Sequence, residues 1–297
     1  MSARGDMTYS RETGWNMGME YCDTCIFRVK GKRRGRRKLG KPTSEAQEKI
    51  NEQNARMKFV RLLHANFSEG EDLKLDLTFD EAHAPETREK AKHLTDNFLR
   101  RVKRHWVGYL ETDGKPFKYL YVIEGGDGKR IHVHMVMSGG LSQVQLRALW
   151  GMAAVVNVDT LQGSSTGFEG LGKYLTKQGR LAGEHRWYGS RNLCEPTYEE
   201  QNNGIKASEV EELARAIEDI NAKVGEGVQS TAERYAPVEE RYPGYYLAEA
   251  SATYIETFRE YVIHIKLYRK DTVAGVDETR RRRAEERELK RQRAAYI

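Results

Sequence analysis

The stretch Ile131-His-Val-His-Met-Val-Met137 alternates strictly and places two histidines, with one residue between them, in an otherwise apolar run. Because successive side chains of a β-strand point to opposite faces, a strand here carries His132 and His134 on one face and Val133 and Met135 on the other. A polar pair in a buried strand is costly without a partner. The pattern therefore predicts that the two imidazoles bind a ligand together.

A carboxylate precedes the histidines. Tyr119-Leu-Tyr-Val-Ile-Glu124 is predicted as a strand, and Gly125-Gly-Asp-Gly-Lys129 as a short hairpin connection. If Glu124 pairs with Arg130, it lies on the same face as His132 and diagonal to it. Two imidazoles and one carboxylate form a site with open positions, which suits Mn²⁺ or Mg²⁺ acting on a phosphate oxygen. The alternative is a surface carboxylate at a strand end.

A tyrosine of the right kind follows. Residues 168–180 are predicted as a short helix that ends at Gly179. On this helix Tyr174, Lys177 and Gln178 share one face, because they are three and four residues apart. A tyrosine hydroxyl, with an ordinary pKa of about 10, needs help to act as a nucleophile at neutral pH. A lysine one turn away can stabilise the phenolate or protonate the leaving oxygen, although such a pair can also be structural.

Together, these elements resemble the HUH superfamily of single-strand nucleases, and most closely its rolling-circle replication initiators. That family has a strand with a hydrophobic-Thr-hydrophobic signature, then a His-hydrophobic-His strand, then a Tyr-x-x-Lys helix. The matching segments here are Leu73-Lys-Leu-Asp-Leu-Thr-Phe79, residues 131–137 and residues 174–177. The resemblance covers roughly residues 70–200, and Tyr188-Gly-Ser-Arg-Asn-Leu193 is similar to the stretch after the tyrosine helix in bacterial and phage members.

The resemblance implies a metal-dependent transesterification, in which tyrosine attacks a phosphodiester and leaves a 5′-phosphotyrosine and a free 3′-hydroxyl. The implied roles are nucleophile for Tyr174, helper for Lys177, and metal ligand for Glu124, His132 and His134. Single-tyrosine transposases of the superfamily use a glutamine four residues after the tyrosine as a ligand. Gln178 therefore stays an alternative to Glu124, and Tyr188 is the nearest alternative nucleophile.

The predicted element order is strand, helix, strand, strand, helix, strand, and then the tyrosine helix. The corresponding segments are 73–79, 86–105, 119–124, 130–137, 142–150 and 155–161. This order builds an antiparallel sheet with helices on one face, an α+β fold of the RRM or ferredoxin type, and leaves the other face for the histidines. By the resemblance, this is the HUH nuclease fold.

Helical and strand extensions flank the predicted core. Helices are predicted at 43–66 and 207–224, strands within 245–269, and an exposed helix at 277–295. The predicted divisions are a basic N-terminal arm and helix (1–66), the nuclease core (67–204), a C-terminal helix and strand extension (205–275), and a basic charged tail (276–297).

The net charge of +6 over 297 residues is concentrated in two short stretches. Residues 28–41 hold nine basic and no acidic side chains, and residues 280–293 hold eight basic and three acidic ones. Such runs are usually solvated, but the glycine-punctuated stretch 31–38 suits phosphate contact. The expected DNA contacts are Arg33, Arg34, Arg36, Arg37, Thr78, Arg100 and Arg101. The last two also suit the C-terminal end of a helix without any DNA.

The sequence has no apolar run of membrane-spanning length and no signal-peptide core, so we expect a cytoplasmic protein without a membrane partner. Three cysteines fit a reducing compartment better than a disulfide scaffold. Cys22 and Cys25 form an isolated C-x-x-C, for which solvent-facing thiols are the first interpretation and zinc the alternative.

The leading hypothesis is a plasmid or phage rolling-circle initiator that nicks and rejoins one DNA strand at a replication origin, at a hairpin or nick site. A host helicase is a candidate partner. The second hypothesis is a single-tyrosine transposase or a relaxase, although relaxases usually place the tyrosine ahead of the histidine strand. The third is a non-catalytic nucleic-acid-binding module on an RRM-like sheet, which predicts no metal requirement and no covalent adduct.

Overall fold

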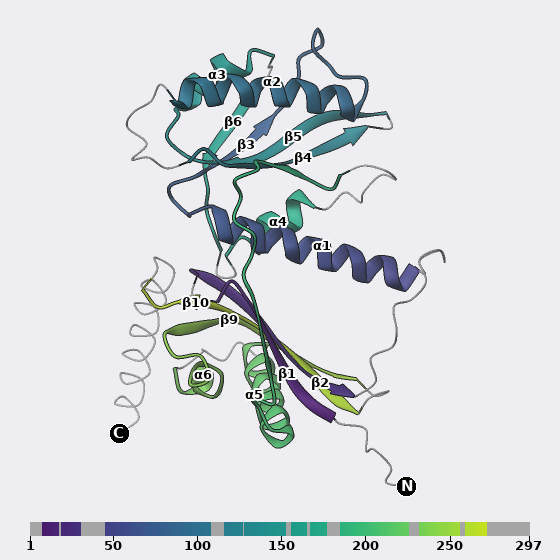
Figure 1. Cartoon of the computed structure of the whole chain (residues 1–297), viewed down its shortest axis with the longest axis vertical. Coiled ribbons are helices and arrows are strands. Elements are labelled where there is room, and N and C mark those ends of the chain that lie inside the picture. The colour runs from purple at the N-terminus through teal and green to yellow at the C-terminus, as the bar shows by residue number, and fades with distance from the viewer. Residues whose placement is uncertain are drawn as a thin grey trace. The chain divides into compact units, whose positions relative to one another are not determined.

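The structure is a computed structural model that describes residues 8–17, 19–30, 45–107, 116–126, 128–152, 156–164, 167–176, 185–225, 232–255 and 259–271. The chain divides into two compact units (Figure 1). The first, called here the histidine unit, contains the described residues of Glu45–Ser164 and Phe168–Glu195. The second, called the flanking unit, contains those of Met1–Ser44, Ser165–Gly167 and Pro196–Ile297.

The described residues of the histidine unit form a five-stranded antiparallel sheet in the order β6-β3-β5-β4-β7. Its strands are β3 (Leu73–Leu77), β4 (Tyr119–Gly126), β5 (Lys129–Met137), β6 (Val156–Thr160) and β7 (Tyr188–Gly189). In the chain, α2 (Arg88–Val107) lies between β3 and β4, and α3 (Gln143–Trp150) between β5 and β6. Ser142 and Gln145 form a capping box at the start of α3, and Gly151 ends it in the left-handed conformation. The predicted α+β fold class is confirmed.

Side-chain alternation gives each face of this sheet its own core. On one face, apolar residues of β3, β4 and β5 pack with α2 and α3; the central ones are Leu75, Leu77, Tyr121, Val133, Met135, Phe98 and Trp150. On the other face, Leu120, Val122 and Val136 pack with α1 (Glu45–Asn66) and α4 (Glu169–Leu175). Figure 1 shows the two helix pairs on opposite sides of the sheet. The second face is therefore partly covered, because its strands carry apolar side chains there as well.

The β4–β5 hairpin decides which side chains meet. Glu124 lies directly opposite His132, and a register shift follows between Glu124 and Gly126. The predicted pairing of Glu124 with Arg130 is wrong, although Glu124 does share the histidine face. Gly125 has φ of 99°, and a Cβ on it would lie 2.3 Å from the Arg130 carbonyl oxygen. A glycine at this position therefore permits the bulge that sets the register.

The described residues of the flanking unit form a second five-stranded antiparallel sheet, in the order β8-β1-β2-β10-β9. Its strands are β1 (Thr8–Trp15), β2 (Tyr21–Lys30), β8 (Tyr198–Asn202), β9 (Tyr245–Ile255) and β10 (Glu260–Arg269). Apolar residues of α5 (Ala207–Gly225) pack against it, and α6 (Ala232–Glu239) contributes Val238 to the same core. Strands β1 and β2 lie where the sequence analysis assigned only a basic arm. The predicted helix at 277–295 lies outside the described residues.

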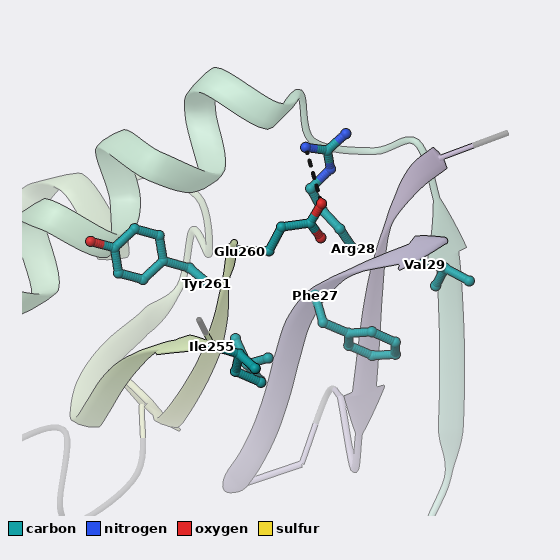
Figure 2. A pocket seen from close by; sticks show the side chains of 7 residues that line it. Phe27, Arg28, Val29, Ile255, Glu260 and Tyr261 are labelled. Atoms are coloured by element: carbon teal, nitrogen blue, oxygen red, sulfur yellow. Dashed lines mark ion pairs between the residues drawn. The ribbon is translucent and has the colours of Figure 1, made fainter. Parts of the chain in front are cut away.

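A pocket of about 290 Å³ lies where β2 and the β9–β10 hairpin come together in the flanking unit. Figure 2 shows its lining side chains, among them Phe27, Val29 and Ile255, with Arg28 and Glu260 turned toward each other. The Arg28 guanidinium lies 3.4 Å from the Glu260 carboxylate. The pocket thus combines an apolar lining with one ion pair, supplied by strands from both ends of the described chain.

Cys22 and Cys25 cannot share a zinc ion, because residues three apart on β2 project from opposite faces of the sheet. Cys22 is buried in the core against α5, and burial raises the pKa of its thiol to about 12. The expectation of solvent-facing thiols is therefore wrong for Cys22. The Cys25 Sγ lies 3.9 Å from His264 Nε2. Among the described helices, none combines the length and apolarity that crossing a membrane requires.

Gly125→Ala is expected to lower the free energy of unfolding by about 1–3 kcal/mol, because alanine tolerates positive φ poorly and its Cβ would collide with the Arg130 carbonyl. Urea denaturation of the full chain measures the change. Gly128→Ala is the matched control, since its φ is 83° but its Cβ would have no atom within 4 Å. Equal losses in the two variants would contradict the role given to the Arg130 contact.

Candidate active site

Three ligand atoms converge on one face of the sheet in the histidine unit. Glu124 of β4 and the two histidines of β5 each offer one atom, and these atoms all lie within 4.8 Å of one another. Glu124 Oε2 lies 2.9 Å from His134 Nε2 and 3.4 Å from His132 Nε2. Glu124 and His134 are buried, whereas His132 is half-buried. The structure thus brings together the three ligands that the sequence analysis named.

Asp76 of β3 supports this cluster from the neighbouring strand. It pairs in register with His134, and its Oδ1 lies 2.5 Å from His134 Nδ1. Lys74 Nζ donates a hydrogen bond of 2.8 Å to the other carboxylate oxygen. Burial alone would raise the pKa of Asp76, but the hydrogen bonds from His134 and Lys74 outweigh it and lower that pKa to about 2. Asp76 is therefore an ionised acceptor.

Both histidines direct the same nitrogen toward Glu124. An ionised carboxylate faces Nδ1 of His134, and the Arg130 carbonyl oxygen lies 3.2 Å from Nδ1 of His132. Since neither oxygen can donate, each Nδ1 carries the hydrogen, which is how a histidine that ligates a metal through Nε2 is normally held. Each Nε2 then faces a carboxylate oxygen, an arrangement that requires a cation.

The spacing of these atoms suits a small divalent metal. Ligands that are neighbours in an octahedron of about 2.1 Å radius lie about 3.0 Å apart. The separations of 2.9 Å and 3.4 Å between Glu124 Oε2 and the two imidazole nitrogens are close to that value. Nitrogen and oxygen ligands without cysteine favour Mn²⁺ or Mg²⁺ over a closed structural zinc site. Glu124, His132 and His134 could therefore hold such an ion.

Tyr174 lies beside the cluster. Helix α4 places its ring 5.1 Å from the His134 ring, at 70° to it. Lys74 Nζ lies 5.9 Å from the centre of the tyrosine ring. Tyr174 is 42 % exposed, so a substrate can reach it. Lys177 and Gln178 lie outside the described residues.

The sequence analysis missed Lys74 and Asp76. The signal was present in Leu73-Lys-Leu-Asp-Leu77, where two charged residues alternate with buried leucines and so share the histidine face. It was not used because a charge on a strand is ordinarily solvated. Only the pairing of β3 with β5 shows that Asp76 meets His134.

Other predicted residues lie away from the cluster. Helix α2 covers the opposite sheet face, and there Arg101 donates hydrogen bonds of 2.8 Å and 3.1 Å to the carbonyl oxygens of Leu149 and Trp150. Arg100 is exposed and lies beside Asn97. Thr78 follows β3, and its carbonyl oxygen accepts from Trp150 Nε1 at 2.8 Å. Arg33, Arg34, Arg36 and Arg37 lie outside the described residues.

Tyr188 also lies on the face away from the histidines. It pairs in register with Tyr121, whose ring belongs to the core beneath α2, and the two rings stack 5.1 Å apart. Glu124 and His134 project from the other face. Tyr188 therefore cannot reach the cluster from this position, and Tyr174 is the tyrosine that lies beside it.

A Glu-His-His cluster on an antiparallel sheet, next to a tyrosine on a short helix, is the arrangement expected of a replication initiator that acts on single-stranded DNA. Residues 73–179 match the family model of replication-associated proteins of the ORF2 type. This match is consistent with a rolling-circle replication initiator, as the sequence motifs predicted, and it supports a general function in replication initiation. No curated protein and no solved structure matches the chain.

Asp76→Ala is expected to weaken Mn²⁺ binding by about 10- to 100-fold, because His134 loses the acceptor that orients its ring. Calorimetric titration of the full chain measures the affinity. Asp80→Ala is the matched control, since Asp80 Oδ1 also lies 2.6 Å from a histidine, His83, but in an exposed pair away from the cluster. An unchanged affinity in Asp76→Ala would show that Asp76 does not orient a ligand.

Proposed function

We propose that the chain is a metal-dependent enzyme that nicks and rejoins single-stranded DNA to initiate rolling-circle replication. The observation that carries this proposal is the position of Tyr174, whose ring lies 5.1 Å from that of His134 within reach of the Glu-His-His cluster. A nucleophile and a metal site must lie this close if both are to act on one phosphate. The match of residues 73–179 to replication-associated proteins supports the same function.

In this mechanism the Tyr174 oxygen attacks the scissile phosphorus, and the bond to the 3′-oxygen breaks. The phenol gives up its proton, and the departing 3′-oxygen takes one up. A Mn²⁺ or Mg²⁺ ion held by Glu124, His132 and His134 would polarise the phosphate. Attack of a 3′-hydroxyl on the phosphotyrosine reverses the reaction and rejoins the strand.

Two lysines are proposed to help. Lys74 lies beside the Tyr174 ring and is held by Asp76, so its charge stabilises negative charge near the reacting groups. Lys177 keeps the helper role that the sequence resemblance implies. Glu124 is preferred to Gln178 as the third ligand, because its carboxylate already lies within 3.4 Å of both imidazole nitrogens.

The non-catalytic alternative is weaker. An RRM-like module binds bases on an open sheet face. Here the corresponding face is partly covered by α1 and α4, and its remaining part holds a buried cluster of Glu124, His134 and Asp76. Buried charge of this kind stabilises a fold poorly, so a function in metal binding accounts for it better.

The family match supports DNA at a replication origin as the partner. We propose single-stranded DNA at a hairpin or nick site as the substrate, with Arg33, Arg34, Arg36, Arg37 and Thr78 among its contacts. A host helicase and a cytoplasmic location belong to the same proposal. A single-tyrosine transposase or relaxase would use the same cluster, and the order of the histidine strand before the tyrosine favours the initiator over the relaxase.

Tyr174→Phe is expected to abolish covalent attachment to single-stranded DNA in the presence of Mn²⁺, because only the attacking hydroxyl is removed. Denaturing gels of the full chain mixed with a single-stranded library detect the adduct, and filter binding checks that affinity is retained. Tyr188→Phe is the control and should form the adduct like the wild type. An adduct that persists in Tyr174→Phe would sink the assignment.

Helix α2 offers a second surface for phosphates. Asn97, Arg100, Arg101, Lys103 and Arg104 line a hollow of about 660 Å³ that contains no acidic side chain. It lies on the sheet face opposite the cluster, so it does not hold the phosphate being cut. We propose that this surface contacts DNA beyond the cleavage site.

Replacing Arg100, Lys103 and Arg104 by alanine is expected to weaken DNA binding for cognate and scrambled oligonucleotides alike. The slope of log K against log salt should flatten by roughly 0.7 per lost contact on a single strand. Arg101 is left in place, because it supports the end of α3. Adduct formation at saturating DNA should keep the wild-type rate. An unchanged salt slope would remove this surface from the DNA path.

A further inference from the structure

Helix α4, which carries Tyr174, has no side-chain cap of its own at its start. Its first turn is held by α1 instead. His64 Nε2 accepts a hydrogen bond of 3.1 Å from the backbone N–H of Phe168, and the two rings stack with their centres 4.6 Å apart at 15°. A residue on α1 therefore satisfies one of the donors that every helix leaves open at its N-terminus.

The acceptor role of His64 requires a neutral ring. Burial lowers the pKa of His64 to about 3, and the nearby Glu169 carboxylate opposes this only partly. Glu169 is itself paired with Lys173 at 2.8 Å. The imidazole is therefore neutral at ordinary assay pH, and Nε2 can accept.

A second contact fixes how closely the two helices approach. Gly172 is buried, and a Cβ on it would lie 2.3 Å from Val60 Cγ2 and 3.9 Å from Phe59 Cδ1. The backbone of α4 thus rests directly on Val60, two residues before the tyrosine. In contrast, a Cβ on Gly170 of the same helix would meet nothing within 4 Å.

Helix α1 ends at Asn66, before the matched segment of residues 73–179 begins. We propose that α1 is a positioning element of the active site, in which Val60 against Gly172 and His64 at Phe168 set the reach of Tyr174 toward the cluster. This inference rests on the proposed function, and it assigns a role in the reaction to residues about a hundred positions away from the tyrosine.

A size exchange across this contact tests the inference. In the full chain, Gly172→Ala should slow adduct formation at saturating DNA by about 10- to 100-fold, because a small displacement of a reacting group has an effect of this size. Val60→Ala alone should be slower by no more than a few fold. The double variant should recover most of the lost rate, since removing the Val60 methyl groups makes room for the new Cβ. Gly170→Ala, in open space, is the control and should match the wild type.

A readout that does not depend on cleavage accompanies the rates. Bound Mn²⁺ broadens nearby NMR signals, so the ring signals of Tyr174 in tyrosine-labelled protein report its distance from the cluster. Broadening should fall in Gly172→Ala and return in the double variant, with Mn²⁺ affinity unchanged throughout. If the wild type forms no adduct but the broadening follows the exchange, the proposed function fails and the positioning role stands.

His64 provides an independent arm if Gly172→Ala does not fold. His64→Gln keeps an acceptor near the Phe168 N–H and should retain most of the rate, whereas His64→Ala should lose it without a change in Mn²⁺ affinity. A double variant no faster than Gly172→Ala, together with equal rates for the two His64 variants, would overturn the inference.

Discussion

Along β5, successive side chains must point to opposite faces of the sheet, and this alternation organises the whole histidine unit. Ile131, Val133, Met135 and Met137 enter the core beneath α2 and α3. His132 and His134 are thereby forced to the other face, where Glu124 and Asp76 meet them from the strands on either side. A slip of one residue would exchange the two sets, so the burial of the apolar residues also fixes the position of the imidazoles.

A chain of charged and polar groups runs across three neighbouring strands: Lys74, Asp76, His134 and Glu124. Each member limits what the next can do, because the lysine keeps the aspartate ionised and the aspartate fixes the tautomer of the histidine. The Nε2 atom that remains faces the carboxylate where a cation is needed. Tyr174 lies at the end of this chain, next to both the histidine and the lysine.

The sequence predicted the fold class and the shared face of the ligands, because a period of two is visible in the residues themselves. It did not predict the register of the β4–β5 hairpin, which depends on a bulge at Gly125. Asp76 was missed because its partner lies on another strand. Strands β1 and β2 were missed for a similar reason, since β2 pairs with β10 near the far end of the described chain. Long-range pairing was therefore the main information that local patterns lacked.

Helix α4 spans Glu169–Leu175, and a helix of seven residues is too short to be stable in water by its own hydrogen bonds. The orientation of its tyrosine is thus a property of the packing beneath it and not of the helix. Scaffold and chemistry are consequently separable in this protein. Substitutions on α1 could retune the reach of the nucleophile for a different strand geometry while every reacting group stays the same, which makes α1 a natural handle for engineering a DNA-joining reagent.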